Sequence, residues 1–210
     1  MTNLCTLLRT LRFMRDESGA AMVEFAMVVS VFFLMVFQII DFGIFTSNNL
    51  MAEKSTQIAT RVATVRPAAC AGLPDRYAIG TASPAPRYGT SCGAVLNACA
   101  MPATVSCAGG AGNTTANEIW TRIAPTMPSG TTISDLTFIY SADPNLGYLG
   151  GPYVPLVTVE LTLPAFQLSF PIGALANLAG GGSGGFSGQP QYRVFSITLP
   201  GEDLATGTNG

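Results

Sequence analysis

A long apolar segment near the N-terminus constrains this chain more than any other feature. It runs from residue 20 to residue 45, and its only charged residues are Glu24 and Asp41. A run of about 20 apolar residues can cross the hydrocarbon core of a membrane as a helix. The apolar region of a cleavable signal peptide has only about 7–15 residues, and no small-x-small cleavage site follows this segment. The sequence therefore predicts a retained membrane-spanning helix.

The basic residues around this segment predict its orientation. Arg9, Arg12 and Arg15 precede it, and the first positive charge after it is Lys54. Because basic residues concentrate on the cytoplasmic side of membrane helices, the N-terminus is expected in the cytoplasm. The rest of the chain is then expected outside it.

The composition argues against several functional classes. Charged residues make up 10% of the chain, against about 25% in an ordinary soluble protein. The net charge is −2 and no basic cluster lies beyond residue 15, so nucleic-acid binding has no electrostatic basis. Histidine, the commonest general base and metal ligand, is absent. We expect no enzyme, no metal site and no cofactor.

Glu24 has two interpretations. In the first, Glu24 and Asp41 mark the two membrane interfaces, since roughly 25 Å of helix separates them. In the second, Glu24 lies within the apolar environment and needs a positive partner, because an unpaired charge there is costly. The first interpretation explains Asp41 well but does not explain why Glu24 is the fifth residue after Gly19.

The sequence around Gly19 resembles a known processing site. Gly19, four small or apolar residues, and then Glu24 and Phe25 follow a basic leader. This pattern looks like the processing site of a type IV prepilin. The wider run DESGAAMVEFAMVVSVFFLMVFQIIDFGIF resembles the TadE-like family of tight-adherence (Flp-type) pilus assembly proteins. The resemblance covers about residues 16 to 60.

The resemblance implies a structural role. A prepilin peptidase would cut after Gly19 and leave Ala20 with a positive amine. Ala20 and Glu24 are four residues apart and share one helical face, so Glu24 could neutralise its own amine or that of an adjoining subunit. The chain would be a pseudopilin or minor pilin of the bacterial inner membrane, with its C-terminal part periplasmic or exported with the pilus.

The family also implies the partners. These are the prepilin peptidase, the major pilin, other TadE-like subunits, the inner-membrane assembly platform and membrane lipid. The alternative is an uncleaved, signal-anchored binding or adhesion module that does not enter a filament.

The apolar segment continues into a second helical stretch without interruption. No proline lies between residues 46 and 66, and Pro67 ends the helical pattern. Met51, Ile58, Val62 and Val65 recur at helical spacing and indicate one apolar face. We expect one helix from residue 20 to about 65. The predicted organisation is a leader at 1–19, a transmembrane helix at 20–45, an amphipathic stem at 46–66 and an extracytoplasmic domain at 67–210.

Four cysteines lie beyond the predicted stem. Cys70, Cys92, Cys99 and Cys107 have neither the C-x-x-C spacing nor the histidine typical of zinc sites. An even number of cysteines outside the cytoplasm indicates two disulfides, and four cysteines allow three pairings. Cys5, on the cytoplasmic side, is expected to be reduced or lost with the leader.

The C-terminal part has strand patterns. Alternating or β-rich sequence predicts strands at 131–140, 157–163 and 192–199, after a short helix at 117–123 whose Trp120 is expected in the core. The glycine-rich run at 180–185 predicts a flexible hairpin loop, since it lacks the Lys-Ser/Thr of a phosphate loop. The expected fold is α+β, with the long helix packed on a small antiparallel sheet.

Overall fold

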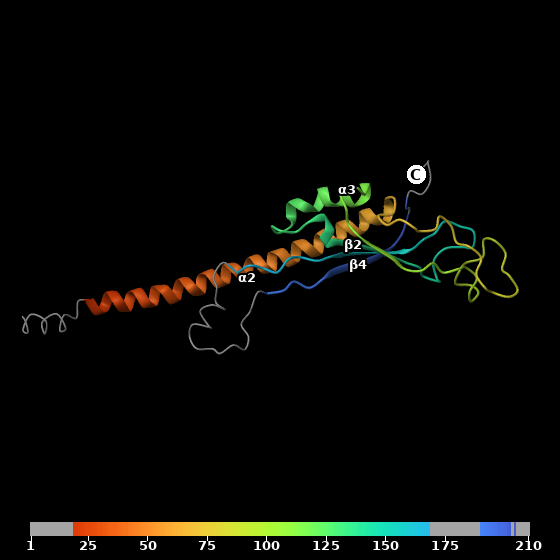
Figure 1. The fold of residues 1–210 in the computed structure, drawn as a ribbon. Helices are drawn as coiled ribbons and strands as arrows, with labels where there is room; N and C mark the ends of the chain where they lie inside the picture. The colour runs from red at the N-terminus through yellow and green to blue at the C-terminus, as the bar shows by residue number, and fades with distance from the viewer. Residues whose placement is uncertain (1–18, 169–189, 203, 205–210) are drawn as a thin grey trace, which may run out of the picture. The chain divides into compact units, whose positions relative to one another are not determined.

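The computed structural model describes residues 19–168, 190–202 and 204. It contains one long helix, one short helix, two 3₁₀ turns and a small sheet (Figure 1). The elements are α2 (Ala20–Val65), β1 (Val105–Ala108), α3 (Thr114–Ile123), η2 (Ala124–Thr126), η3 (Ile133–Asp135), β2 (Leu136–Ser141), β3 (Leu156–Leu161) and β4 (Phe195–Pro200). This arrangement confirms the predicted α+β fold and the predicted single helix from residue 20 to 65.

The chain divides into two compact units, and the boundary lies inside α2 between Phe45 and Thr46. The first unit contains the first half of α2, up to Phe45. The second unit begins at Thr46 and contains the second half of α2, α3 and the sheet. Each unit is described by itself below.

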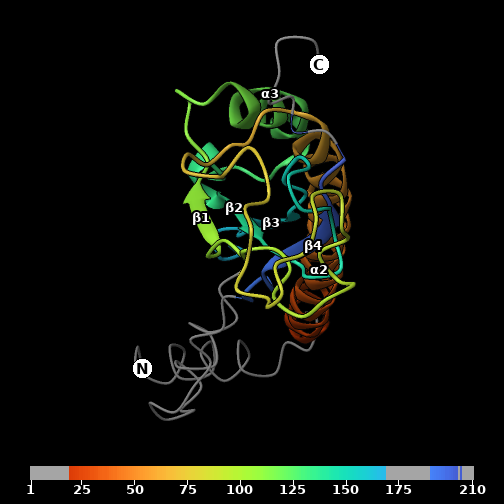
Figure 2. The same cartoon turned by 90° about the vertical axis from the view of Figure 1, so that its right-hand side faces the viewer.

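The sheet of the second unit has the order β1-β2-β3-β4 with antiparallel neighbours (Figure 2). Phe138 of β2 lies opposite Val159 of β3, which in turn lies opposite Ile197 of β4. Alternate residues of β2 and β3 are buried. One face of the sheet therefore lies in the core, as the period of two requires.

Both helices contribute to the core on that face. The core cluster joins Ala59 of α2 and Ile119 of α3 to Phe138 and Val159 of the sheet. The residues of α2 in this cluster are mostly small: Ala52, Ala59, Val62 and Ala63. Small side chains allow the helix backbone to approach its neighbours closely. The fit of α2 on its domain therefore depends on residues that carry little hydrophobic signal.

Buried hydroxyl groups lie on the same face of α2. Thr56 and Thr60 are fully buried. Thr56 Oγ1 donates to the carbonyl oxygen of Ala52 at 2.8 Å, and Thr60 Oγ1 donates to that of Thr56 at 2.8 Å. These bonds satisfy hydroxyl groups that would be costly to bury unpaired.

The apolar face predicted for the second half of α2 is not the face that packs on the domain. Of the four residues that defined it, only Val62 is buried. Met51, Ile58 and Val65 are 47%, 48% and 41% exposed. The face of α2 that packs on the domain is instead formed mainly by alanine and threonine.

The strand predictions were correct for three elements and missed one. The regions around 131–140, 157–163 and 192–199 contain β2, β3 and β4, although residues 133–135 form the turn η3. β1 is not among the predicted strands, because its four residues are too few for a periodic pattern. Trp120 is only partly buried at the edge of the core.

A second, smaller cluster supports the loops between the elements. It contains Tyr77, Cys92, Cys99, Leu149 and Tyr153. The rings of Tyr77 and Tyr153 meet edge to face with centroids 5.2 Å apart. These loops thus have a core of their own within the second unit. Residues 1–18 of the predicted leader and the glycine-rich run at 180–185 lie outside the described residues.

Candidate functional site

The predicted processing site lies at the start of α2. Gly19 directly precedes Ala20, the first residue of the helix, and both are exposed. A Cβ atom on Gly19 would meet no other atom within 4 Å in the described part of the chain. Gly19 also lacks the positive φ that favours glycine. Within the described structure, neither packing nor backbone conformation requires a glycine here.

Glu24 lies one helical turn after Ala20. Both residues are exposed, and their four-residue separation places them on one helical face. Among the described residues, no basic side chain forms an ion pair with Glu24. The structure thus places Ala20 and Glu24 together on the helix, and a positive group at Ala20 would be close to the carboxylate.

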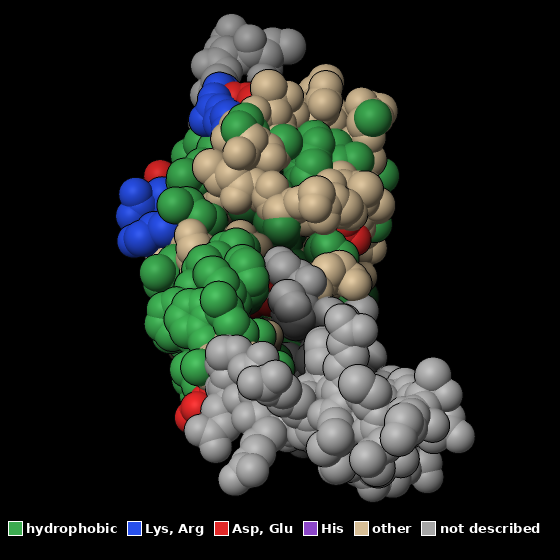
Figure 3. Space-filling model, turned by 90° about the vertical axis from the view of Figure 1, so that its left-hand side faces the viewer, with side chains coloured by type: hydrophobic (Ala, Val, Ile, Leu, Met, Phe, Trp, Pro, Cys, Tyr) green, Lys and Arg blue, Asp and Glu red, His purple; other side chains and the backbone are tan. Residues whose placement is uncertain are grey.

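The first half of α2 is mostly apolar, and most of its residues are exposed. It contains a segment long and apolar enough to cross a membrane, and none of that segment is buried. Hydrophobic side chains gather in one area of the surface shown in Figure 3. The large exposed apolar residues before Thr46 are Met22, Val23, Phe25, Met27, Val28, Val31, Phe32, Phe33, Met35, Phe37, Ile39, Ile40, Phe42 and Ile44. A helix that is hydrophobic all round needs an apolar environment, such as lipid or other helices.

Asp41 differs from its neighbours on the helix. It is only 2% exposed and has a polar or electrostatic partner. A carboxylate in such a place is normally paired or hydrogen-bonded, because burial of an isolated charge is costly. Asp41 and Glu24 are 17 positions apart on α2, so the structure does not bring the two acids together.

The four cysteines beyond α2 form two pairs at disulfide distance. Cys70 pairs with Cys107, with Cα atoms 5.6 Å apart, and Cys92 pairs with Cys99, with Cα atoms 5.2 Å apart. The structure thus has one of the three pairings that the sequence allowed. In the described part of the chain, no group of three or more His, Cys, Asp or Glu residues is placed to hold a metal ion.

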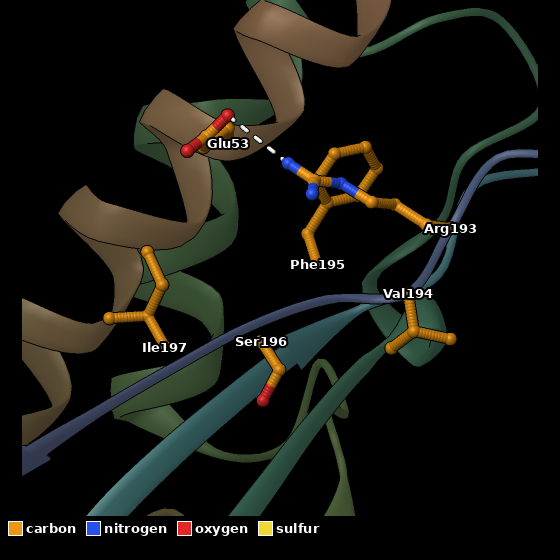
Figure 4. Close-up of a pocket in the computed structure, with 6 residues that line it drawn as sticks. All are labelled: Glu53, Arg193, Val194, Phe195, Ser196 and Ile197. Atoms are coloured by element: carbon orange, nitrogen blue, oxygen red, sulfur yellow. Dashed lines mark hydrogen bonds and ion pairs between the residues drawn. The ribbon is translucent and has the colours of Figure 1, made fainter.

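The sequence analysis missed an ion pair between α2 and the segment before β4. Arg193 Nη2 lies 3.3 Å from Glu53 Oε2, and its guanidinium lies 5.4 Å from the centre of the Phe195 ring (Figure 4). These residues line a surface pocket of about 250 Å³ together with Val194, Ser196 and Ile197. Glu53 and Arg193 are 140 positions apart in the sequence, so no local signal pointed to this pair.

This pocket lies where the segment before β4 contacts the second half of α2. Its only charged side chains are Glu53 and Arg193, and these neutralise each other. Nearby, Asn48 Nδ2 donates to Tyr192 Oη at 3.0 Å. These contacts hold the segment that leads into β4 against the second half of α2.

Three tyrosines of the second unit have raised pKa values. Burial is the main cause for Tyr77, Tyr140 and Tyr153. The hydroxyl of Tyr140 accepts a hydrogen bond from the backbone N–H of Ala69 at 2.9 Å, which acts in the opposite direction on its pKa. These hydroxyls remain protonated at neutral pH, and that of Tyr77 donates to the carbonyl oxygen of Val154 at 2.9 Å.

Comparison with known proteins links the helix to one family. The family model for TadE-like proteins matches residues 19–61, which confirms the resemblance seen in the sequence. The match begins at Gly19 and covers nearly all of α2. No curated protein and no solved structure matches the chain. The match associates this segment with pilus proteins of a structural, non-enzymatic family.

Proposed function

We propose that this protein is a pseudopilin or minor pilin of a tight-adherence pilus, anchored in the inner membrane and cut after Gly19 by a prepilin peptidase. The observation that carries the proposal is the family match at residues 19–61, whose first residue directly precedes the start of α2. The proposed cut would produce a mature chain that begins with an uninterrupted helix.

The environment of Gly19 supports a role in processing. Because neither backbone conformation nor described neighbours require glycine at this position, a requirement for glycine would come from recognition by the peptidase. The exposure of Gly19 and Ala20 leaves the bond between them accessible to an enzyme.

The proposed role of Glu24 is to pair with the amine that cleavage creates. Glu24 has no ion-pair partner among the described residues of the single chain, and it lies in the apolar half of α2. Pairing with the amine of Ala20, in the same subunit or in an adjoining one, would make this charge tolerable in lipid or in a filament core.

The proposed topology places the N-terminus in the cytoplasm and the second unit on the periplasmic side. The predicted distribution of basic residues supports this orientation. Two cysteine pairs at disulfide distance in the second unit also support it, because disulfides persist in oxidising compartments. The proposed partners are the peptidase, the major pilin, other TadE-like subunits and the assembly platform.

The deciding experiment identifies the first residue of the membrane-extracted protein by mass spectrometry, in cells with and without the cognate prepilin peptidase. We expect a chain that starts at Ala20 only when the peptidase is present. Gly19→Leu should block the cut, whereas Gly110→Leu, at an open position of the second unit, should not. An intact N-terminus in all samples would contradict processing and favour the signal-anchored binding module.

A further inference from the structure

Five exposed residues on the second half of α2 follow a seven-residue repeat. Met51, Ile58 and Val65 are apolar and seven positions apart, and Lys54 and Arg61 are basic and seven positions apart. All five are exposed. We call these five residues the heptad stripe.

The spacing of the heptad stripe is that of a helix-packing seam. Its members alternate at intervals of three and four, which keeps side chains on one line along a helix that packs against another helix. The opposite face of the same turns, with Ala52, Ala59 and Ala63, is buried in the protein's own core. The heptad stripe is therefore the face that the domain leaves uncovered.

The heptad stripe carries uncompensated positive charge. The only acidic residue in the second half of α2 is Glu53, and Arg193 binds it at 3.3 Å. In the described parts of the chain, neither Lys54 nor Arg61 forms an ion pair. A partner that covers the stripe must therefore supply negative charge as well as an apolar surface.

We infer that the heptad stripe binds a helix of a different subunit, one with an apolar seam flanked by glutamate or aspartate at seven-residue intervals. The apolar residues of the partner would pack against Met51, Ile58 and Val65, and its acids would pair with Lys54 and Arg61. This inference rests on the proposed assembly function and adds the chemistry of one partner.

A second copy of this chain fits the heptad stripe poorly. In a parallel, in-register pair, Lys54 would face Lys54 and Arg61 would face Arg61. In an antiparallel pair the basic residues would face apolar ones, and the stripe has no acid to offer in either orientation. Like charges across a helix seam disfavour the wrong partner.

A lipid surface is also a poorer fit. Helices that lie in a membrane interface present a wide apolar face opposite a polar one. Here the apolar residues form a single line, with Lys54 and Arg61 within that line. A narrow seam of this kind matches the width of one helix.

The test measures binding of a fluorescent helical peptide to the full chain in neutral detergent. The probe is an acidic peptide of three heptads, with leucine in its seam and glutamate beside it. A basic peptide, with lysine in place of each glutamate, is the control. We expect the acidic peptide to bind at least about tenfold more tightly, since two favourable ion pairs would replace two repulsive contacts. The double variant K54E/R61E should reverse this preference.

A matched pair of variants tests whether the apolar residues of the heptad stripe contribute to binding of the peptide. Ile58 and Ile79 are 48% and 47% exposed, but only Ile58 lies in the heptad stripe. Ile58→Asp should weaken binding of the acidic peptide at least about tenfold, and Ile79→Asp should leave it unchanged. The thermal unfolding of each variant shows whether it remains folded.

Four outcomes would overturn the inference. The first two are equal binding of the two peptides and equal effects of the two isoleucine variants. The others are tighter binding of a labelled second copy than of the acidic peptide, and an effect of K54E/R61E that appears only with anionic lipid. Cleavage after Gly19 is measured separately, by mass spectrometry of the N-terminus. Failure of the peptide-binding test therefore does not contradict the proposed cleavage, and absence of cleavage does not contradict peptide binding.

Discussion

Cys70, five residues beyond the end of α2, is bonded to Cys107 of β1. This bond closes a loop of 37 residues between the helix and the first strand. The second bond, between Cys92 and Cys99, lies inside this loop and spans only seven residues. The two bonds are therefore nested and constrain very different lengths of unfolded chain.

The longer loop should contribute more stability. By the chain-entropy relation, loss of Cys70–Cys107 in the C70S/C107S variant should cost about 4 kcal/mol, and loss of Cys92–Cys99 in C92S/C99S about 2 kcal/mol. Urea unfolding of the detergent-solubilised variants, followed by tryptophan fluorescence, measures both. A larger cost for the seven-residue loop would contradict the assignment of the main constraint to Cys70–Cys107.

Glu24 should be needed for assembly. If Glu24 pairs with the amine of Ala20, Glu24→Gln should reduce recovery of the protein in sheared pili at least about tenfold, because the amine would lose its partner in an apolar environment. Immunoblots of the sheared fraction and of the membranes measure this ratio. Glu202→Gln, an exposed acid of the second unit, is the control. Unchanged recovery of Glu24→Gln would refute the charge pairing.

The packed face of α2 should not tolerate larger side chains. Ala59 is fully buried in the core, so Ala59→Leu should lower the free energy of unfolding by about 1–3 kcal/mol through overpacking. The neighbouring Ile58 is 48% exposed, and Ile58→Leu should change it by less than about 0.5 kcal/mol. Thermal unfolding of the two variants measures the difference, and equal effects would contradict the assignment of the packed face.

Gly147 should be intolerant of substitution. It has a φ of +80°, and an added Cβ would overlap the ring of the buried Tyr77. Gly147→Ala should therefore cost about 2 kcal/mol or more, from backbone strain and displacement of that ring. Gly110 has open space around it and no positive φ, so Gly110→Ala is the control. Circular dichroism during heating compares their unfolding midpoints.

Tyr140 should make stability depend on alkaline pH. Burial raises the pKa of Tyr140 above its ordinary value of 10.0, so the native state holds the phenolic proton more tightly than the unfolded state. The resulting stability is fully present below pH 10 and is lost as the pH rises through the raised pKa.

Tyr140→Phe should isolate this effect. At neutral pH it should cost about 1 kcal/mol, because Ala69 N–H loses its acceptor. Above pH 10 the variant should lose less stability than the parent chain. Tyr88→Phe, at a side chain that is 78% exposed, is the control. Unfolding midpoints from pH 7 to about 11 measure both, and parallel curves for parent and Tyr140→Phe would refute the linkage.

Local sequence rules were enough to predict the long helix and most of the sheet. The unbroken run between Ala20 and Pro67 contains no proline, so a helix from 20 to 65 followed from local rules alone. Period-two alternation located β3, and the spacing of Gly19 and Glu24 pointed to the family that matches residues 19–61. These signals are local, and each involves residues within a few turns or one strand.

The contacts between distant residues could not be predicted from local sequence. The pairing of Cys70 with Cys107, the ion pair of Glu53 with Arg193, and the packing of Ala59 in the core connect positions far apart in sequence. Local periodicity favours large apolar residues, and of the four that indicated an apolar face of α2 only Val62 is buried. Close approach of helix and sheet needs small side chains instead, and which face comes close depends on the shape of the rest of the domain.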